Sequence, residues 1–223
     1  MPLNELPNRP ARLTDAVYRE LRAAILRGDP APGQQLSVPE IARQLDVSRG
    51  SVREAVLQLV ADGLAVERPR RGVVVATIGV PEIRYIHQVR EVLEGMAARL
   101  CAEAPSQELI TSLEAALSAQ HQAIASQDGT GYAETDAQFH TLLAEACDNP
   151  VLASLIERLH TQMQIALSLV AEAPEHRRRG CEELTQVLEA VRAGDPDAAE
   201  SAMRAHIRRT RGAVDTATAG RAQ

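Results

Sequence analysis

The chain has 223 residues, of which 45% are hydrophobic and 24% charged, so it can form one or two packed domains and is unlike a disordered chain. Aromatic residues make up only 2% and tryptophan is absent, which argues against β-sandwiches and against nucleic-acid binding by base stacking. All 24 basic residues are arginines, and the net charge of −6 divides into +2 for residues 1–76 and −8 for residues 77–223. This division predicts two modules with different partners.

The cysteines and the apolar segments exclude two further classes. Cys101, Cys147 and Cys181 are odd in number and widely spaced, which indicates core residues rather than a disulfide framework or a zinc knuckle. The N-terminal segment lacks the apolar core of a signal peptide, and no segment has the run of about 18 apolar residues that a membrane helix needs. We therefore expect a cytoplasmic protein with no membrane partner.

The first module, residues 1–76, has the pattern of a helix-turn-helix. Residues 14–27 have helical periodicity and end in a segment rich in glycine and proline. Ser37 and Glu40 have the spacing of a capping box at the start of a second, short helix. A third helix begins after Ser48 and ends near Gly63. Its apolar residues follow at intervals of three and four positions and predict one buried face: Val52, Ala55, Val56 and Leu59.

Arginines mark the parts of this module that could contact DNA. Arg49 and Arg53 lie opposite the apolar face, in the first turns of the third helix, where free backbone amides also attract phosphate. Residues 64–68 and 73–76 are β-branched runs separated by a turn that contains Arg70 and Arg71. This pattern predicts a two-stranded wing suited to phosphate or minor-groove contact. The alternative is that the hairpin and the charged helix face are solvated surfaces of an ordinary helical domain and do not bind DNA.

Residues 12–76 resemble the winged-helix domain of GntR-family transcriptional regulators. The resemblance rests on the run Val47–Val56, on Leu59, and on the sequences Asp62-Gly63-Leu64 and Arg70-Arg71-Gly72. It implies that Arg49 and Arg53 contact the major groove, that Ser48 and Ser51 hold phosphates, and that Gly72 marks the tip of the wing. Gly50 stands where the family usually has threonine, which affects the operator sequence rather than the binding mode. The predicted DNA-contacting residues are Ser48, Arg49, Gly50, Ser51, Arg53, Arg70, Arg71 and Gly72.

The second module is expected to be an all-α bundle of six helices. After a linker at residues 77–82, helices are predicted at 83–104, 106–127, 132–147 and 151–171, then a helix that ends at Gly194, and a last one at 197–214. Residues 215–223 are expected to form a flexible tail, so the effector and dimerisation domain spans 83–214. The whole chain is therefore predicted to be mostly α, with a small β-wing in its first module. Bundles of this kind build ligand sites between facing helices.

Three residues of the bundle have the types and spacing of metal ligands. Asp136 and His140 are four positions apart and share one helix face, and His206 falls on the buried side of the last helix. Two imidazoles and one carboxylate suit a divalent cation when water or an effector completes the coordination. A buried histidine paired with an aspartate is the structural alternative. His87, His121 and His160 have no partner at a suggestive spacing and are expected to be surface or core residues.

Most of residues 80–212 resemble the FCD effector domain of the FadR-type subfamily. The resemblance is carried by the segment from Asp136 to Leu152, by the run Val187–Asp195, and by Met203 and His206. It implies a divalent ion of the zinc, nickel or manganese class, held by one aspartate and three histidines. Leu184 occupies the position expected for the third histidine, which leaves occupancy open. The resemblance also suggests that Arg90 faces the effector cavity, where it could bind a carboxylate; an ion pair with Glu94 on the helix surface is the alternative.

Together these patterns predict a ligand-responsive transcriptional regulator, most simply a repressor, that binds a near-palindromic duplex operator as a homodimer. One winged helix contacts only a few base pairs, so two half-sites multiply specificity. Two alternatives stay open: a metal-dependent enzyme with an accessory winged helix, and a DNA-binding dimer without an effector. Against the enzyme, no nucleophile with an adjacent base accompanies Asp136 and His140.

Overall fold

The computed structural model describes the backbone of residues 11–167 and 174–219, and within these ranges the side chains of residues 13–164 and 174–212. The chain divides into two compact units, Met1–Ile78 and Gly79–Gln223. Most of the described residues are helical, and the strands of the described part form one small antiparallel sheet in the first unit. The predicted fold class is confirmed. None of the described helices is long and apolar enough to cross a membrane.

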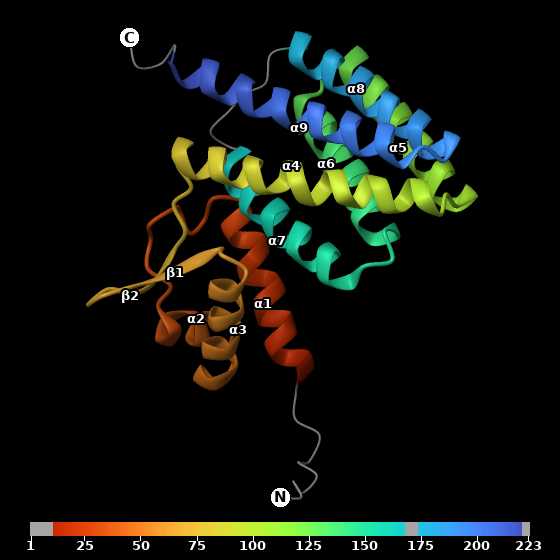
Figure 1. The fold of residues 1–223 in the computed structure, drawn as a ribbon. Coiled ribbons are helices and arrows are strands. Elements are labelled where there is room, and N and C mark those ends of the chain that lie inside the picture. Colours follow the sequence, from red (N-terminus) through yellow and green to blue (C-terminus); the bar gives the residue numbers. More distant parts are fainter. Residues whose placement is uncertain (1–10, 168–173, 220–223) are drawn as a thin grey trace, which may run out of the picture. The chain divides into compact units, whose positions relative to one another are not determined.

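The first unit is a helix-turn-helix followed by a β-hairpin (Figure 1). Its helices are α1 (Ala11–Leu26), α2 (Val38–Gln44) and α3 (Arg49–Ala61). The predicted stripe of α3 is buried, with Val52, Ala55 and Leu59 fully inaccessible, and α3 packs against α1. Burial of a side chain the size of leucine contributes about 1.5–3 kcal/mol, so this contact anchors the exposed face of α3.

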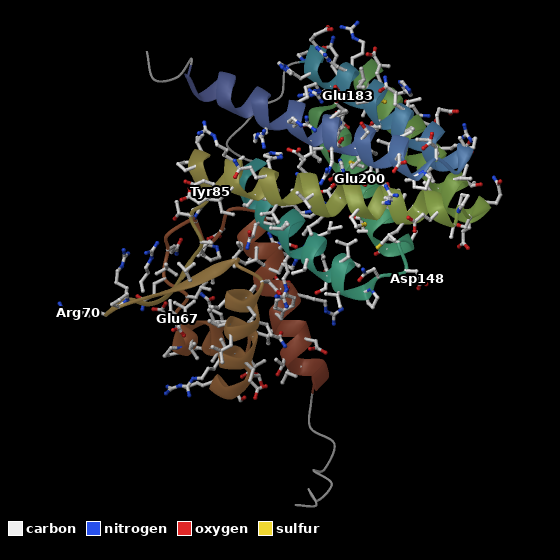
Figure 2. All side chains as sticks on the ribbon, in the orientation of Figure 1. Glu67, Arg70, Tyr85, Asp148, Glu183 and Glu200 are labelled. Carbon is white, nitrogen blue, oxygen red and sulfur yellow. The ribbon has the colours of Figure 1, made fainter. Side chains whose placement is uncertain are left out.

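The wing consists of β1 (Ala65–Arg68) and β2 (Gly72–Val75), paired from Ala65–Val75 to Arg68–Gly72. The turn has left-handed backbone at Arg70 (φ 64°) and at Gly72 (φ 69°). Glycine adopts this conformation without steric cost, which explains its presence at position 72. The backbone amides of Gly33 and Leu36 donate to the carbonyls of Val75 and Val73, so the loop before α2 is bonded along β2 of the wing. Figure 2 shows Arg70 at the outer tip of the hairpin.

The second unit is the six-helix bundle, counted over the described residues. Its helices are α4 (Val80–Glu103), α5 (Gln107–Ala125), α6 (Gly129–Ala146), α7 (Pro150–Leu167), α8 (Pro174–Ala193) and α9 (Pro196–Ala219). Helix α9 lies along α4, and α5 packs between α6 and α8 (Figure 1). The centre of the core is made of fully buried side chains from all six helices, including Ala98, Leu113, Phe139, Ile156, Leu184 and Met203.

The predicted starts of α4 and α6 are wrong by about one turn and those of α7 and α9 by one residue, and capping explains these differences. Helix α4 begins at Val80 rather than residue 83, because Glu82 accepts a hydrogen bond from the amide of Gly79, so the linker is shorter than predicted. Helix α6 begins at Gly129 rather than Tyr132, because Asp128 accepts from the amides of Thr130 and Gly131. Asparagine and aspartate caps likewise begin α7 and α9 at Pro150 and Pro196.

The remaining predictions concern two helix ends and two helix starts, at Ser37 and Ser48. Helix α9 continues to Ala219, so residues 215–219 of the expected flexible tail are helical; residues 220–223, and the predicted end of a helix at Ala171, lie outside the described residues. Ser48 is the N-cap of α3, and its hydroxyl accepts from the amide of Ser51. Ser37 is the N-cap of α2, but its side chain makes no capping hydrogen bond, so the predicted capping box does not form.

Candidate nucleic-acid interface and candidate metal centre

The exposed face of α3 carries the residues that the sequence predicts for DNA contact. Arg49, Gly50 and Arg53 are exposed, and Ser51 is half-buried beside the N-cap Ser48. The hydroxyls of Ser48 and Ser51 lie 3.0 Å apart at the N-terminus of the helix. Among the described side chains, Arg49 and Arg53 form no ion pair, so both guanidinium groups are available to an anionic partner.

The wing adds a second cationic element to the same unit. Arg70, Arg71 and Gly72 are exposed at its tip, and the described carboxylates form no ion pair with either arginine. Two separate sets of unpaired arginines, one at a helix N-terminus and one on a hairpin, suit simultaneous contact with a major groove and the adjacent backbone or minor groove.

In the second unit the structure brings the three predicted metal ligands together. Donor atoms of Asp136, His140 and His206 lie within 4.8 Å of one another, although α6 and α9 are far apart in sequence. Nε2 of His140 is buried without a hydrogen-bond partner in the described structure and lies 3.8 Å from Oδ2 of Asp136. Gln120 donates to the other carboxylate oxygen of Asp136, Oδ1, at 3.2 Å. The free oxygen and the free ring nitrogen therefore face each other.

Two glutamates hold the opposite nitrogens of the two imidazoles. Nδ1 of His140 lies 2.5 Å from Oε2 of Glu94, an ion-pair contact without hydrogen-bond geometry, whereas Nδ1 of His206 is hydrogen-bonded to Oε2 of Glu183 at 3.1 Å. Histidines that bind metals usually donate their second ring nitrogen to a carboxylate, which fixes the tautomer and the ring orientation. The donor set therefore fits a divalent ion with three protein ligands and open positions.

The fourth metal-ligand position that the family resemblance implies is occupied by the aliphatic side chain of Leu184. Leu184 is fully buried in the hydrophobic core with Val187 and Val191. His176 is exposed near the start of α8 and His121 contacts the thiol of Cys181, so neither joins the group in the described structure.

The sequence did not predict the buried charge cluster around Glu94. Nε of Arg90 donates to Glu94 at 2.6 Å, and Nε2 of His160 lies 3.0 Å from the same oxygen. The alternative of an Arg90–Glu94 ion pair is right about the partners, but both residues are buried, so it is wrong about their place on the helix surface. The i, i+4 spacing indicated this pair, but no sequence pattern links His160 to it, because α7 meets α4 only in the folded bundle.

Burial and neighbouring charges shift the pKa values of this cluster. Burial alone would raise the pKa of Glu94, but Arg90 and His140 hold it well below its usual range. Burial lowers the pKa of His160 and of His206, against the opposing effect of their glutamate partners. Burial and the nearby Arg90 lower the pKa of His87 to about 3. These shifts keep Glu94 ionised and favour the neutral form of His160 and His206, the form in which an imidazole binds a metal.

A cavity of about 450 Å³ adjoins this centre and is lined by residues of five helices, α4 and α6 to α9. Its lining includes His87, Arg90, Asp136, His140, His160 and Arg177. The volume lies within the range of about 300–1,000 Å³ that is typical of small-molecule sites. The three cysteines are buried, as expected; burial raises the pKa of Cys101 to about 12 and that of Cys181 to about 11.

Two family models match the chain, one in each unit. Residues 13–75 match "Bacterial regulatory proteins, gntR family" and residues 85–209 match "FCD domain". The chain is 30% identical to the HTH-type transcriptional repressor RspR of Escherichia coli, over 86% of this chain and 84% of that protein. It is 29% identical to the HTH-type transcriptional repressor NanR of Enterobacter sp., over 88% of this chain and 83% of that protein.

Solved structures show the same arrangement of elements. E. coli McbR/YncC has a TM-score of 0.76 at 25% identity, covering 92% of this chain and 97% of that one. A putative GntR transcriptional regulator from Rhodococcus sp. RHA1 also has a TM-score of 0.76, at 26% identity, covering 93% and 99%.

Proposed function

The chain belongs to the gntR family of bacterial regulatory proteins and carries an FCD domain, and on this premise we propose that it is an effector-responsive repressor that binds a near-palindromic operator as a homodimer. It is a transcriptional regulator rather than an enzyme, because its family and its relatives are regulators. The enzyme with an accessory winged helix is therefore discarded. Because its proposed partner is duplex DNA, we place the protein in the cytoplasm.

The observation that carries the DNA assignment is the pair of unpaired arginines on the exposed start of α3. Arg49 and Arg53 are one turn apart and project from a helix whose opposite face is fixed in the core. In the proposed complex this end of α3 enters the major groove, Ser48 and Ser51 contact phosphate, and the wing tip with Arg70 and Arg71 follows the adjacent backbone or minor groove. Gly50 presents backbone rather than a side chain to the bases.

Dimerisation is supported by an exposed apolar stripe on α4. Tyr85, Val89, Val92 and Met96 are 62%, 48%, 51% and 44% exposed, although large apolar side chains usually avoid water. Their intervals of four, three and four residues place them on one face of the helix, in the heptad spacing of a helix-to-helix seam. A second copy of this chain, offering the same stripe across a two-fold axis, is the occupant that this spacing fits.

The cavity in the bundle is the proposed effector site, and the adjoining centre is the proposed metal site. Asp136, His140 and His206 would hold the ion, which would supply a Lewis-acidic position for an oxygen atom of the effector. Arg90, the predicted effector contact, lines the same cavity, but its charge is already paired with that of Glu94. Leu184 is not among the lining residues, which argues against the alternative of a cavity filled by that side chain. Effector binding would then favour one spacing of the two winged helices.

The DNA assignment is tested by selecting a preferred duplex and measuring its affinity at fixed salt. Arg49→Ala should cost about 1–3 kcal/mol on that duplex and relax its sequence preference. Arg19→Ala, on the exposed surface of α1, is the matched control for loss of one positive charge. If the protein binds selected and scrambled duplexes equally, or if the two variants behave alike, the assignment of α3 is wrong.

A further inference from the structure

One wall of the effector cavity contains a buried imidazole without a partner. His87 is 1% exposed, lines the cavity from α4, and has no hydrogen-bond partner for either ring nitrogen in the described structure. A buried polar group left unsatisfied is costly, so native proteins rarely leave one without a partner, a ligand or water. Its lowered pKa keeps the ring neutral, and a neutral imidazole offers one donor and one acceptor. His87 is therefore equipped for a hydroxyl or amide group.

The two arginines of the cavity differ in how their charge is compensated. Arg90 is buried against Glu94, and the same carboxylate also contacts His140 and His160. An anion placed beside Arg90 would also lie beside this ionised carboxylate, and the repulsion would cancel much of the attraction. Arg177 lines the cavity from α8 and forms no ion pair with a described carboxylate. Arg177 is therefore the cavity arginine whose positive charge no described carboxylate neutralises.

Arg177 is held in place by contacts that do not neutralise it. Its guanidinium lies about 6.0 Å from the ring centre of Tyr132, and a Cβ atom at Gly129 would come within 2.7 Å of its Nη2. Glycine at the start of α6 thus makes room for this side chain. Asp136, a carboxylate that lines the cavity, is seven residues beyond Gly129 along α6, a rise of about 10 Å. Arg177 and Asp136 form no ion pair among the described side chains.

We propose that the effector is a small molecule with two unlike ends, an anionic group bound by Arg177 and a neutral hydroxyl or amide group bound by His87. The inference deepens the effector role given under Proposed function and rests on it. It assigns the anion to the α6–α8 end of the cavity, away from Arg90, and the neutral group to the α4 wall.

The test compares carboxylates with their primary carboxamides, which share a skeleton and differ in charge. Glycolate, benzoate and 3-hydroxybenzoate are each paired with the corresponding amide, and binding to the full-length protein is measured by thermal shift and calorimetry. We expect at least one carboxylate to bind more tightly than its amide. Arg177→Gln should weaken that carboxylate by roughly 10- to 100-fold and leave the amide unchanged. Arg178→Gln, an exposed neighbour paired with Glu175, should behave as wild type.

His87→Phe separates the two ends of the ligand. It should abolish the advantage of 3-hydroxybenzoate or glycolate over a carboxylate without a hydroxyl group, while the preference for carboxylate over amide stays. The proposal is overturned if no carboxylate binds better than its amide, or if the preference survives in Arg177→Gln. Duplex affinity without any compound, measured in parallel, distinguishes this outcome from failure of the proposed function, since Arg177 lies outside the DNA-binding unit.

Discussion

We expect loss of the Glu94 charge to destabilise the second unit more than loss of any other side-chain charge. Its carboxylate is 2% exposed and lies within 2.6 Å of Nε of Arg90, 3.0 Å of Nε2 of His160 and 2.5 Å of Nδ1 of His140. Glu94→Gln keeps the shape and removes the charge, so the buried guanidinium loses its counter-ion. Breaking a buried ion pair in this way costs about 3–5 kcal/mol. For a unit of this size that corresponds to a fall of about 6–20 °C in Tm.

The assay is urea unfolding of the full chain followed by far-UV circular dichroism. Glu175→Gln is the matched control: it breaks an exposed ion pair with Arg178 on α8 and should change the free energy of unfolding by less than about 1 kcal/mol. The double variant Arg90→Met/Glu94→Met should recover a large part of the loss, because it leaves no uncompensated charge of the pair. If Glu94→Gln costs no more than Glu175→Gln, the cluster does not stabilise the fold as argued.

The remaining predictions concern the metal, helix capping and pH. Glu183→Gln should lower zinc affinity by about 10- to 100-fold in calorimetry, because Glu183 orients His206; unchanged affinity would exclude this role. Ser48→Ala should lower the free energy of unfolding of the first unit by about 0.5–2 kcal/mol, whereas Ser37→Ala, which removes no capping bond, should have little effect in the same titration. Because the pKa of His87 falls from 6.5 to about 3 on folding, the unfolded chain binds the extra proton between these values, and stability should fall with decreasing pH by about 1.4 kcal/mol per unit. His87→Phe should remove the contribution of His87 to the slope of the free energy of unfolding against pH, measured in unfolding titrations between pH 6 and 4. If the variant and the wild type have the same slope, the assignment of this slope to His87 is wrong.

The winged helix was predictable because its signals are local. The buried stripe of α3, the N-cap at Ser48 and the turn at Gly72 each depend on residues a few positions apart, and the structure has all three. The failures are equally local in origin. Ser37 has the right spacing for a capping box but makes no such bond, and Asp128 caps α6 one turn earlier than the glycines around it suggest.

The centre in the bundle could be predicted only in part. Spacing placed Asp136 and His140 on one helix face, and periodicity turned His206 inward, so these three residues were available from the sequence. Glu94, His160 and Glu183 were not, because each reaches the centre from a different helix, and no periodicity within one helix records which residues of another it will meet.

Sequence alone thus determined what each helix or hairpin would be and which of its faces would be apolar, since backbone preference and hydrophobic spacing act over a turn or two. Tertiary structure decided the chemistry of the cavity. Whether Arg90 carries free charge depends on whether Glu94 is buried beside it, and whether His87 is a spare ligand depends on what the packed helices leave unsatisfied. Electrostatic energy depends on distance and burial in three dimensions, and both are properties of the packed bundle.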